Sequence, residues 1–232
     1  MPQPTSALAF APPRQRRKQA RPQELLNAAL ELFVEKGFSA TRSEEVAARA
    51  GVSKGTLYLY FPSKEELFKA VVRNNIAALI AEGQRIADHF DGPSTELLRL
   101  LMNAWWQRVG DTAAGGIFKI IFAEARNFPE LAQFYTDEVA LPGRRLVAGL
   151  LQRGIERGEF RAVPVAETTQ ALISPMLFQA LHRHSVGACP VMEPEMSPAR
   201  LLDAQFDLIL HGLAPRQAGN SATAARTRRA AP

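Results

Sequence analysis

The chain has 232 residues, of which 47% are hydrophobic, with a single cysteine and a formal net charge of +5. This length suits one large domain or a small domain fused to a medium one, and the apolar content excludes disordered and fibrous classes. One cysteine excludes both an intrachain disulfide framework and a cysteine-based metal cluster.

The first third of the chain predicts two helices in succession. Residues 22–36 carry apolar side chains at helical spacing, with Pro22 at the start and Gly37 as the stop. Residues 41–50 follow, and Thr41, with a glutamate three residues later, is expected to cap their N-terminus. A glycine also ends the second helix, so we expect this helix to be short.

A third short helix and a long fourth one follow. The third covers residues 53–60, with Ser53 as its expected cap and Leu57 as its expected buried anchor. It ends before a proline, because the residue preceding proline is pushed out of the α region. Ser63 then caps a long helix that runs toward Ile86.

Helical spacing continues to the end of the chain and predicts an all-α fold. We expect helices over 94–109, 113–125, 129–157, 165–184 and 197–213. A kink is expected at Pro142-Gly143, and Pro175 lies inside its helix. No run of alternating β-branched residues has the length of a strand, and the sequence has no internal repeat.

Positive charge gathers at the two ends of the chain. Residues 1–70 carry eleven Lys and Arg against seven acidic residues, whereas residues 71–215 carry thirteen against sixteen. The last 17 residues add four arginines. A polyanion would therefore bind at the ends of the chain or in its first third. A basic tail can also serve solubility alone. Residues 1–20 and 215–232 are interpreted as disordered basic tails.

The start of the chain does not look like a secretory signal. Its short apolar patch precedes its charges, and no segment of the sequence approaches roughly 18–20 consecutive apolar residues. We therefore expect a soluble, cytoplasmic protein that makes no membrane contact.

Three short helices, with a tight glycine-containing turn before the last, are the pattern of a helix-turn-helix module. In that geometry the third helix enters the major groove, and its N-terminal end is aimed at the bases. A glycine inside that helix lowers helix stability by roughly 1 kcal/mol. A need for the backbone to approach DNA closely would explain why a side chain is absent there. The residues at this end are Ser53, Lys54, Gly55 and Thr56.

Two tyrosines and a lysine extend the candidate DNA surface. Tyr58 and Tyr60 can each send a phenolic hydroxyl group to a phosphate, and Lys64 adds a charge beside free backbone N–H groups. Each tyrosine could equally close the small core with Phe33 and Leu57, as tyrosines at helical spacing often do.

The stretch "GFSATRSEEVAARAGVSKGTLYLYFPSKEELF", residues 37–68, closely resembles the DNA-binding segment of the TetR/AcrR family of bacterial transcriptional regulators. The resemblance implies a DNA-binding domain, a larger helical domain that dimerises and holds an inducer pocket, and repression by blocking a promoter. It adds Arg42 to the expected DNA contacts, beside Ser53, Lys54, Thr56, Tyr58, Tyr60 and Lys64. Leu59 departs from the histidine or tyrosine common at its position. Residues 121–161 are similar to the second domain of one AcrR-like branch.

These observations divide the chain into a DNA-binding domain, residues 21–68, and a ligand-binding and dimerisation domain, residues 69–214. Large apolar and aromatic groups of the second domain are the candidates for a pocket, although many of them must be ordinary core. Trp105 and Trp106 point about 100° apart on a helix, so one of them should leave the core. The candidates are Met102, Trp105, Trp106, Phe118, Phe122, Phe134, Tyr135, Met176, Phe178 and His182.

The last two helices are expected to form the dimer interface, as the resemblance implies. The final helix carries an apolar stripe that either this interface or packing within one chain would explain. Its residues are Leu201, Leu202, Phe206, Ile209 and Leu210. The expected DNA partner is a palindromic operator, because two-fold symmetric sites match a two-fold symmetric dimer.

The function predicted from the sequence is a dimeric, sequence-specific repressor that a small-molecule effector releases from its operator. A non-specific nucleic-acid-binding protein that uses its basic tails is the alternative, and it would discriminate little between DNA sequences. A helical enzyme is a third reading, although the sequence has no phosphate-cradling loop, HExxH pair or Ser/His/Asp order. We expect no catalytic residues, no cofactor and no metal.

Overall fold

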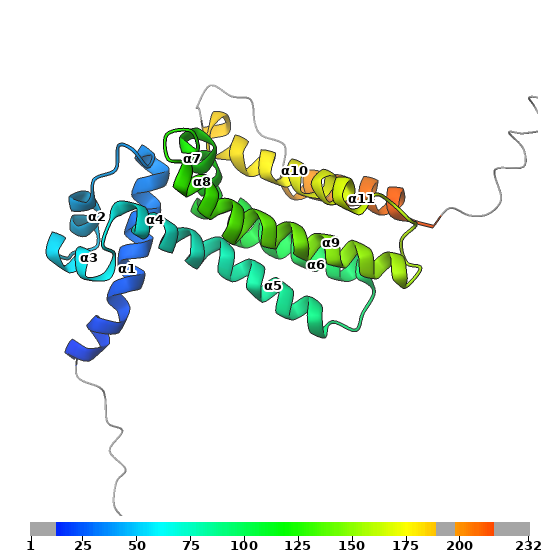
Figure 1. The fold of residues 1–232 in the computed structure, drawn as a ribbon, viewed down its shortest axis with the longest axis horizontal. Coiled ribbons are helices and arrows are strands. Elements are labelled where there is room, and N and C mark those ends of the chain that lie inside the picture. The colour runs from blue at the N-terminus through cyan, green and yellow to red at the C-terminus, as the bar shows by residue number, and fades with distance from the viewer. Residues whose placement is uncertain (1–12, 189–197, 216–232) are drawn as a thin grey trace, which may run out of the picture.

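The structure, a computed structural model, describes residues 13–188 and 198–215, and these residues form helices and turns without a strand. The predicted all-α class is confirmed. Figure 1 shows a small helical unit at one end of an elongated bundle. Within the described residues no helix combines the length and the apolar character that a membrane span needs.

The small unit is built from α1 (Pro13–Lys36), α2 (Ser43–Arg49) and α3 (Lys54–Tyr60), with α4 (Lys64–Val72) packed against α1. Gly37 ends α1 with a φ of +86°, a left-handed conformation that glycine adopts without a Cβ penalty. Fully buried side chains fill the space between these helices, among them Phe33, Leu57 and Phe68.

Two predictions at the start of this unit are wrong. Helix α1 begins at Pro13 rather than Pro22, because the Arg, Gln, Lys and Ala residues before Pro22 favour a helix but have no apolar periodicity to reveal it. Residues 13–20 of the predicted N-terminal tail are therefore helical. Residues 1–12 and 216–232, where the rest of the predicted tails falls, lie outside the described residues.

Thr41 is not the cap of α2. Arg42 occupies that position, and its N–H donates to the Glu45 carboxylate at 3.2 Å. The Thr41 hydroxyl is buried instead and points back to α1, where the carbonyl oxygens of Leu32 and Gly37 accept from it at 3.1 and 2.7 Å. Thr41 therefore bonds back to carbonyl oxygens at and just after the C-terminal end of α1, and it does not cap N–H groups at the start of α2.

The second part of the chain forms the bundle. Helix α4 continues through a π-helical turn into α5, and the same kind of turn separates α8 from α9. The remaining α-helices are α5 (Ala78–His89), α6 (Ser94–Trp105), α7 (Gly116–Glu124), α8 (Pro129–Tyr135), α9 (Leu141–Glu156), α10 (Val165–Arg183) and α11 (Pro198–Leu213). Helix α9 packs against α5, α6 and α10, and α11 lies beside α10 in the outer layer (Figure 1).

The interruption expected at Pro142-Gly143 lies slightly earlier. Residues Thr136–Ala140 form the π-helical turn, and Pro142 sits in the first turn of α9. Proline has no N–H for the carbonyl four residues before it, so the regular α-helical ladder has to change before it reaches Pro142. Pro175 lies inside α10, as predicted.

Two buried clusters fill the part of the molecule that residues 13–188 and 198–215 form. The first joins the small unit to the near end of the bundle, since it contains Phe33 and Phe68 together with Phe118 and Phe134. The second fills the far end of the bundle around α6, α9, α10 and α11. The predicted division at residue 68 therefore falls inside α4 and inside a shared core, because α4 belongs to both parts.

Candidate nucleic-acid interface and ligand pocket

The turn between α2 and α3 sets the position of the third helix. Gly51 has a φ of +66°, and the Val52 N–H donates to the Ala47 carbonyl at 2.9 Å to close the turn. The Ser53 hydroxyl oxygen then accepts the Thr56 N–H at 3.1 Å. The predicted cap at Ser53 is confirmed, and the N-terminal end of α3 faces outward.

Helix α3 buries one side and exposes the other. Leu57 is fully buried, as predicted. Tyr58 and Tyr60 keep 39% and 37% of their surface exposed, and Leu59 keeps 85%. Neither tyrosine belongs to the buried cluster of this unit, and neither hydroxyl group has a hydrogen bond to another described residue. Both hydroxyl groups are therefore available to a partner outside the chain.

The other predicted DNA-binding residues lie around this face. Arg42, Ser53, Lys54 and Gly55 are exposed, whereas Thr56 is half-buried and its hydroxyl group lies 2.9 Å from Ser53 Oγ. Helices α2 and α3 form the outer surface of the small unit (Figure 1). These residues therefore lie on or at the ends of the two outer helices, and their contacts with DNA stay a prediction.

Lys64 has another role in the structure. Its ammonium group donates to the carbonyl oxygens of Phe38, Ser39 and Thr41 at 2.9, 3.2 and 3.1 Å, and it lies 4.6 Å from the Phe38 ring centroid. All three N–H bonds of this lysine are used within the chain. Lys64 therefore holds the turn between α1 and α2, a role that the sequence analysis did not foresee.

An acidic residue pairs with Lys54 on the exposed surface. Lys54 Nζ contacts a Glu44 carboxylate oxygen from α2 at 2.5 Å. This hydrogen bond raises the pKa of Lys54 and lowers the pKa of Glu44, so both groups are charged at neutral pH. A phosphate or a guanine that binds Lys54 must therefore compete with the Glu44 carboxylate for its ammonium group.

Replacing Glu44 with glutamine is therefore expected to tighten DNA binding. An ion pair between fully solvated side chains is weak and screened by salt, so the gain in affinity should be small. A fluorescence titration of duplex DNA at fixed salt measures it. Glu96→Gln makes the same change of net charge at an exposed position of α6, away from α3, and should leave the affinity unchanged. Weaker binding by Glu44→Gln would show that Glu44 positions Lys54 rather than restraining it.

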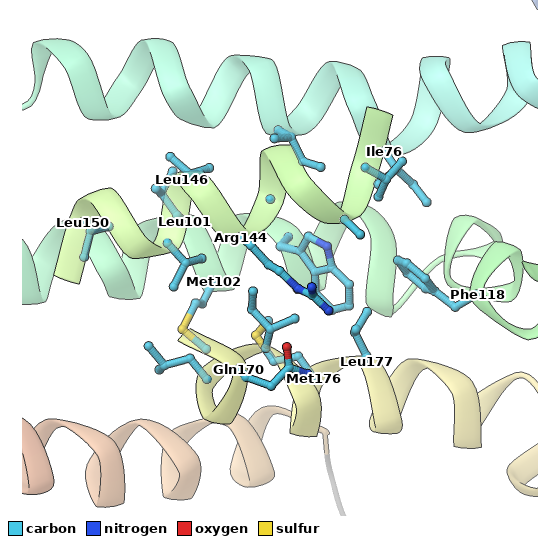
Figure 2. A pocket seen from close by; sticks show the side chains of 18 of the residues that line it. Ile76, Leu101, Met102, Phe118, Arg144, Leu146, Leu150, Gln170, Met176 and Leu177 are labelled. Carbon is cyan, nitrogen blue, oxygen red and sulfur yellow. The ribbon is translucent and has the colours of Figure 1, made fainter. Parts of the chain in front are cut away.

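A cavity of about 300 Å³ lies within the bundle, lined from α5, α6, α7, α8, α9 and α10 and from the π-helical turns before α5 and α9 (Figure 2). It is placed where the two buried clusters meet: Phe118 belongs to the first cluster, and Leu150 and Met176 belong to the second. Almost all of its lining is apolar, and the lining residues with a polar side-chain group are Arg144, Gln170, Tyr135 and Trp105. This composition is typical of a small-molecule site.

Six of the ten predicted pocket residues line this cavity: Met102, Trp105, Phe118, Phe122, Tyr135 and Met176. The prediction that the two adjacent tryptophans would separate is confirmed. Trp105 faces the cavity, whereas Trp106 is 6% exposed and packs in the second cluster. Their difference follows from the 100° step between neighbouring helical residues.

The other predicted pocket residues lie elsewhere. Phe134 is buried in the first cluster, where it packs under α4. Phe178 is 61% exposed on α10, and its ring centroid lies 6.1 Å from that of His182. Neither Phe178 nor His182 lines the cavity. Aromatic character alone does not separate core, cavity and outer surface, which explains these corrections.

Arg144 and Gln170 line the cavity and were not predicted. Both are polar residues on long amphipathic helices, so a sequence reading assigns them to solvent. The available signal was their place beside apolar neighbours one turn away, such as Val147 and Ile173, which also line the cavity. Burial raises the pKa of Tyr135, and the charge of Arg144 acts in the opposite direction.

The predicted dimer stripe on α11 divides in two. Leu202 and Phe206 are 5% and 1% exposed within one chain, so they pack inside the bundle and cannot form an interface. Leu201, Ile209 and Leu210 are half-buried. The apolar residues that α10 and α11 leave most exposed are Phe178 and Leu208, with 61% and 75% of their surface free.

The turn between α1 and α2 is fastened to α7. The Glu124 carboxylate at the end of α7 accepts from the Ser39 hydroxyl at 2.6 Å and from the Ser39 N–H at 3.2 Å. The rings of Phe38 and Phe128 meet edge-on beside it, with centroids 5.0 Å apart. The hydrogen bonds from Ser39 lower the pKa of Glu124. The stability that this contact contributes is therefore fully present above the ordinary pKa of a glutamate and is lost as pH falls through the lowered pKa.

A helix-turn-helix unit carried by a helical bundle with an apolar cavity defines a DNA-binding regulator that responds to small molecules. Residues 25–71 match the family described as bacterial regulatory proteins, tetR family, and residues 91–188 match the tetracyclin repressor-like C-terminal domain. The chain belongs to the TetR family of bacterial transcriptional regulators, which is not an enzyme family.

Individual relatives agree with this placement. The HTH-type transcriptional repressor KstR2 of Mycolicibacterium smegmatis is 31% identical over 143 residues, which cover 61% of this chain and 68% of KstR2. The crystal structure of the TetR family regulator PfmR from Thermus thermophilus superposes with a TM-score of 0.65 at 28% identity, covering 82% of this chain and 99% of PfmR. The ketosteroid transcriptional regulator KstR2 of Mycobacterium tuberculosis gives a TM-score of 0.64 at 25% identity, with 84% and 96% covered.

Proposed function

We propose that this regulator is a dimeric repressor that binds a palindromic operator through α2 and α3 and leaves it when an effector fills the cavity. Residues 21–68 carry the DNA contacts, and residues 69–214 carry the cavity and the dimer interface. The observation that carries the proposal is the exposed face of α3, where hydroxyl groups and a lysine stand free of the core.

The residues of this face divide by the chemistry that each offers to DNA. Lys54 and Thr56 lie at the N-terminal end of α3, the end that reads base edges in a helix-turn-helix. The hydroxyl groups of Tyr58 and Tyr60 suit phosphates, which fix register without reading sequence. Arg42, at the cap of α2, adds a bidentate donor for the adjacent phosphate.

A second copy of the chain would pair along α10 and α11. Exposed Phe178 and Leu208 lie on these two helices, which form the outer layer of the bundle (Figure 1). A two-fold axis through this layer makes the surface self-complementary and leaves both α3 helices free for adjacent major grooves. Two half-sites centred roughly 34–36 Å apart would match such a dimer.

The cavity reaches the DNA-binding unit through α7. Phe118 and Phe122 of α7 line the cavity, and Glu124 of the same helix holds Ser39 in the turn before α2. An effector that displaces α7 therefore moves the turn that leads into α2 and α3. It releases DNA only if it binds the displaced arrangement more tightly than the DNA-bound one.

Glu124→Ala is expected to reduce the release of the operator by the effector. Its operator affinity without effector should stay within about threefold of that of the unchanged chain. Coupling energies between sites typically correspond to 5–150-fold changes in affinity, so the loss of operator affinity caused by an effector should shrink about fivefold or more. Operator titrations measure the ratio with and without saturating decan-1-ol or decanoate, whichever of the two releases the operator from the unchanged chain. Glu130→Ala, at an exposed position of α8, is the matched control, and an equal ratio in both variants would place the coupling elsewhere.

Selection from a random duplex library at near-physiological salt tests the function as a whole. We expect the full chain to enrich a palindrome and to sediment as a dimer in the same buffer. Retained DNA without an enriched motif would support a non-specific nucleic-acid-binding protein instead, because phosphate contacts alone do not discriminate between sequences.

A further inference from the structure

The lining of the cavity is apolar except at one place. Among the described residues Arg144 on α9 is the only charged residue that lines it, and Gln170, Tyr135 and the indole of Trp105 are the other lining side chains that carry a polar group. Figure 2 shows the side chains of Arg144 and Gln170 approaching each other from α9 and α10. An apolar ligand body would therefore meet a single cation, which Figure 2 shows between the lining residues Leu146 and Phe118.

Arg144 has no anionic partner of its own. Across residues 13–188 and 198–215 its guanidinium group makes no ion pair and no hydrogen bond. Arg153 on the same helix contrasts with it, because its guanidinium group donates to the Gly92 carbonyl at 2.8 Å. Arg144 is exposed, so water solvates it while the cavity is open. The Tyr135 hydroxyl group likewise has no hydrogen bond to a described residue.

Filling the cavity changes the surroundings of this cation. An apolar body against Met176 and Phe118 removes water from the side of Arg144 that faces the cavity, and a charge that loses water without gaining a partner is costly. A neutral apolar ligand would leave the guanidinium group in that state. A ligand with anionic oxygens would supply charge-assisted, bidentate hydrogen bonds.

We infer that the effector is an amphipathic anion, with a carboxylate or phosphate headgroup bound by Arg144 and an apolar body in the cavity. This inference rests on the proposed function, in which the cavity holds the effector. At about 30 Å³ for each water-sized group, the 300 Å³ cavity accepts a body of roughly ten non-hydrogen atoms. Gln170 and Tyr135 add neutral donors for the same headgroup.

Ligands that share one alkyl group but differ in headgroup separate the contribution of the headgroup to binding from that of the apolar body. Decanoate, decyl phosphate, decan-1-ol and decylammonium are titrated by calorimetry into the full chain and into the variants Arg144→Gln, Arg144→Lys and Arg145→Gln. Arg145 is the neighbouring exposed arginine and does not line the cavity, so it is the matched control. Operator release is measured in parallel with the duplex that the library selection recovers.

We expect the unchanged chain to bind at least one of the two anions about tenfold or more tightly than decan-1-ol, and decylammonium most weakly. Arg144→Gln should lose this preference and bind decan-1-ol as before. Arg144→Lys should keep part of it, and Arg145→Gln should keep all of it. The stronger of the two anions identifies the headgroup.

A preference that survives in Arg144→Gln, or equal binding of decanoate, decyl phosphate and decan-1-ol by the unchanged chain, overturns the inference. If decan-1-ol also releases the operator in that case, the proposed function stands and only the anionic headgroup is lost. If no ligand of the series binds, the inference falls. Operator selection and dimerisation then still report separately on the repressor.

Discussion

Phe38→Ala is expected to lower the free energy of unfolding by about 3–5 kcal/mol, as removal of a buried aromatic ring does. Phe38 is fully buried, and its ring lies 5.7, 5.3 and 5.0 Å from the rings of Phe33, Phe68 and Phe128. The cluster joins α1, α4 and the segment before α8. Urea unfolding followed by circular dichroism, at one fixed protein concentration, measures the loss.

The same substitution should also weaken DNA binding, because Phe38 and Lys64 together hold the turn that leads to α2. Phe122→Ala removes an equally large ring that is 55% exposed, so its effect on unfolding should stay below about 1 kcal/mol. A loss below about 1 kcal/mol in Phe38→Ala as well would show that the aromatic cluster does not hold the two parts of the chain together.

Leu208→Arg is expected to separate the dimer into monomers. Leu208 is 75% exposed on one chain, and a two-fold interface carries the substitution twice. At about 2 kcal/mol for each copy of a central interface residue, the dimer dissociation constant should rise roughly a thousandfold. Analytical ultracentrifugation measures it, and operator affinity should fall with it because a monomer reaches one half-site.

Leu100→Arg places the same charge on an exposed leucine of α6 and should leave the dimer intact. Circular dichroism should show unchanged helix content in both variants, since neither side chain is buried. A Leu208→Arg protein that remains a dimer would move the interface away from α10 and α11. Loss of operator binding without loss of the dimer would instead point to a direct role of α11 in DNA binding.

The local features of the DNA-binding unit could be predicted because they depend on residues close together in the chain. Ser53 and Ser63 cap α3 and α4 through N–H groups three residues ahead, at 3.1 Å in both cases. Leu57 is buried because it lies on the inner face of a short amphipathic helix. Such capping bonds join residues within one helical turn, and the apolar periodicity depends on residues within a single helix.

Contacts between distant segments could not be predicted in the same way. Thr41 could cap the helix that follows or bond back to the helix that precedes it, and packing against Leu32 and Gly37 decides for the second. Lys64 could face a phosphate or the carbonyl oxygens of a turn that lies 23–26 residues earlier in the chain. A hydroxyl or ammonium group offers the same donors to either partner, so composition does not distinguish them.

The sequence by itself determined the all-helical fold, the helix-turn-helix unit and the family, because helical periodicity, capping residues and turn glycines act over a few neighbouring residues. Only the tertiary structure decided which large side chains serve the core, the cavity or the outer face. Trp105 faces the cavity and Trp106 the core, while Phe206 is buried and Leu208 exposed. Each of these outcomes depends on where other helices lie, since an apolar side chain gains the same free energy from any partner that removes it from water.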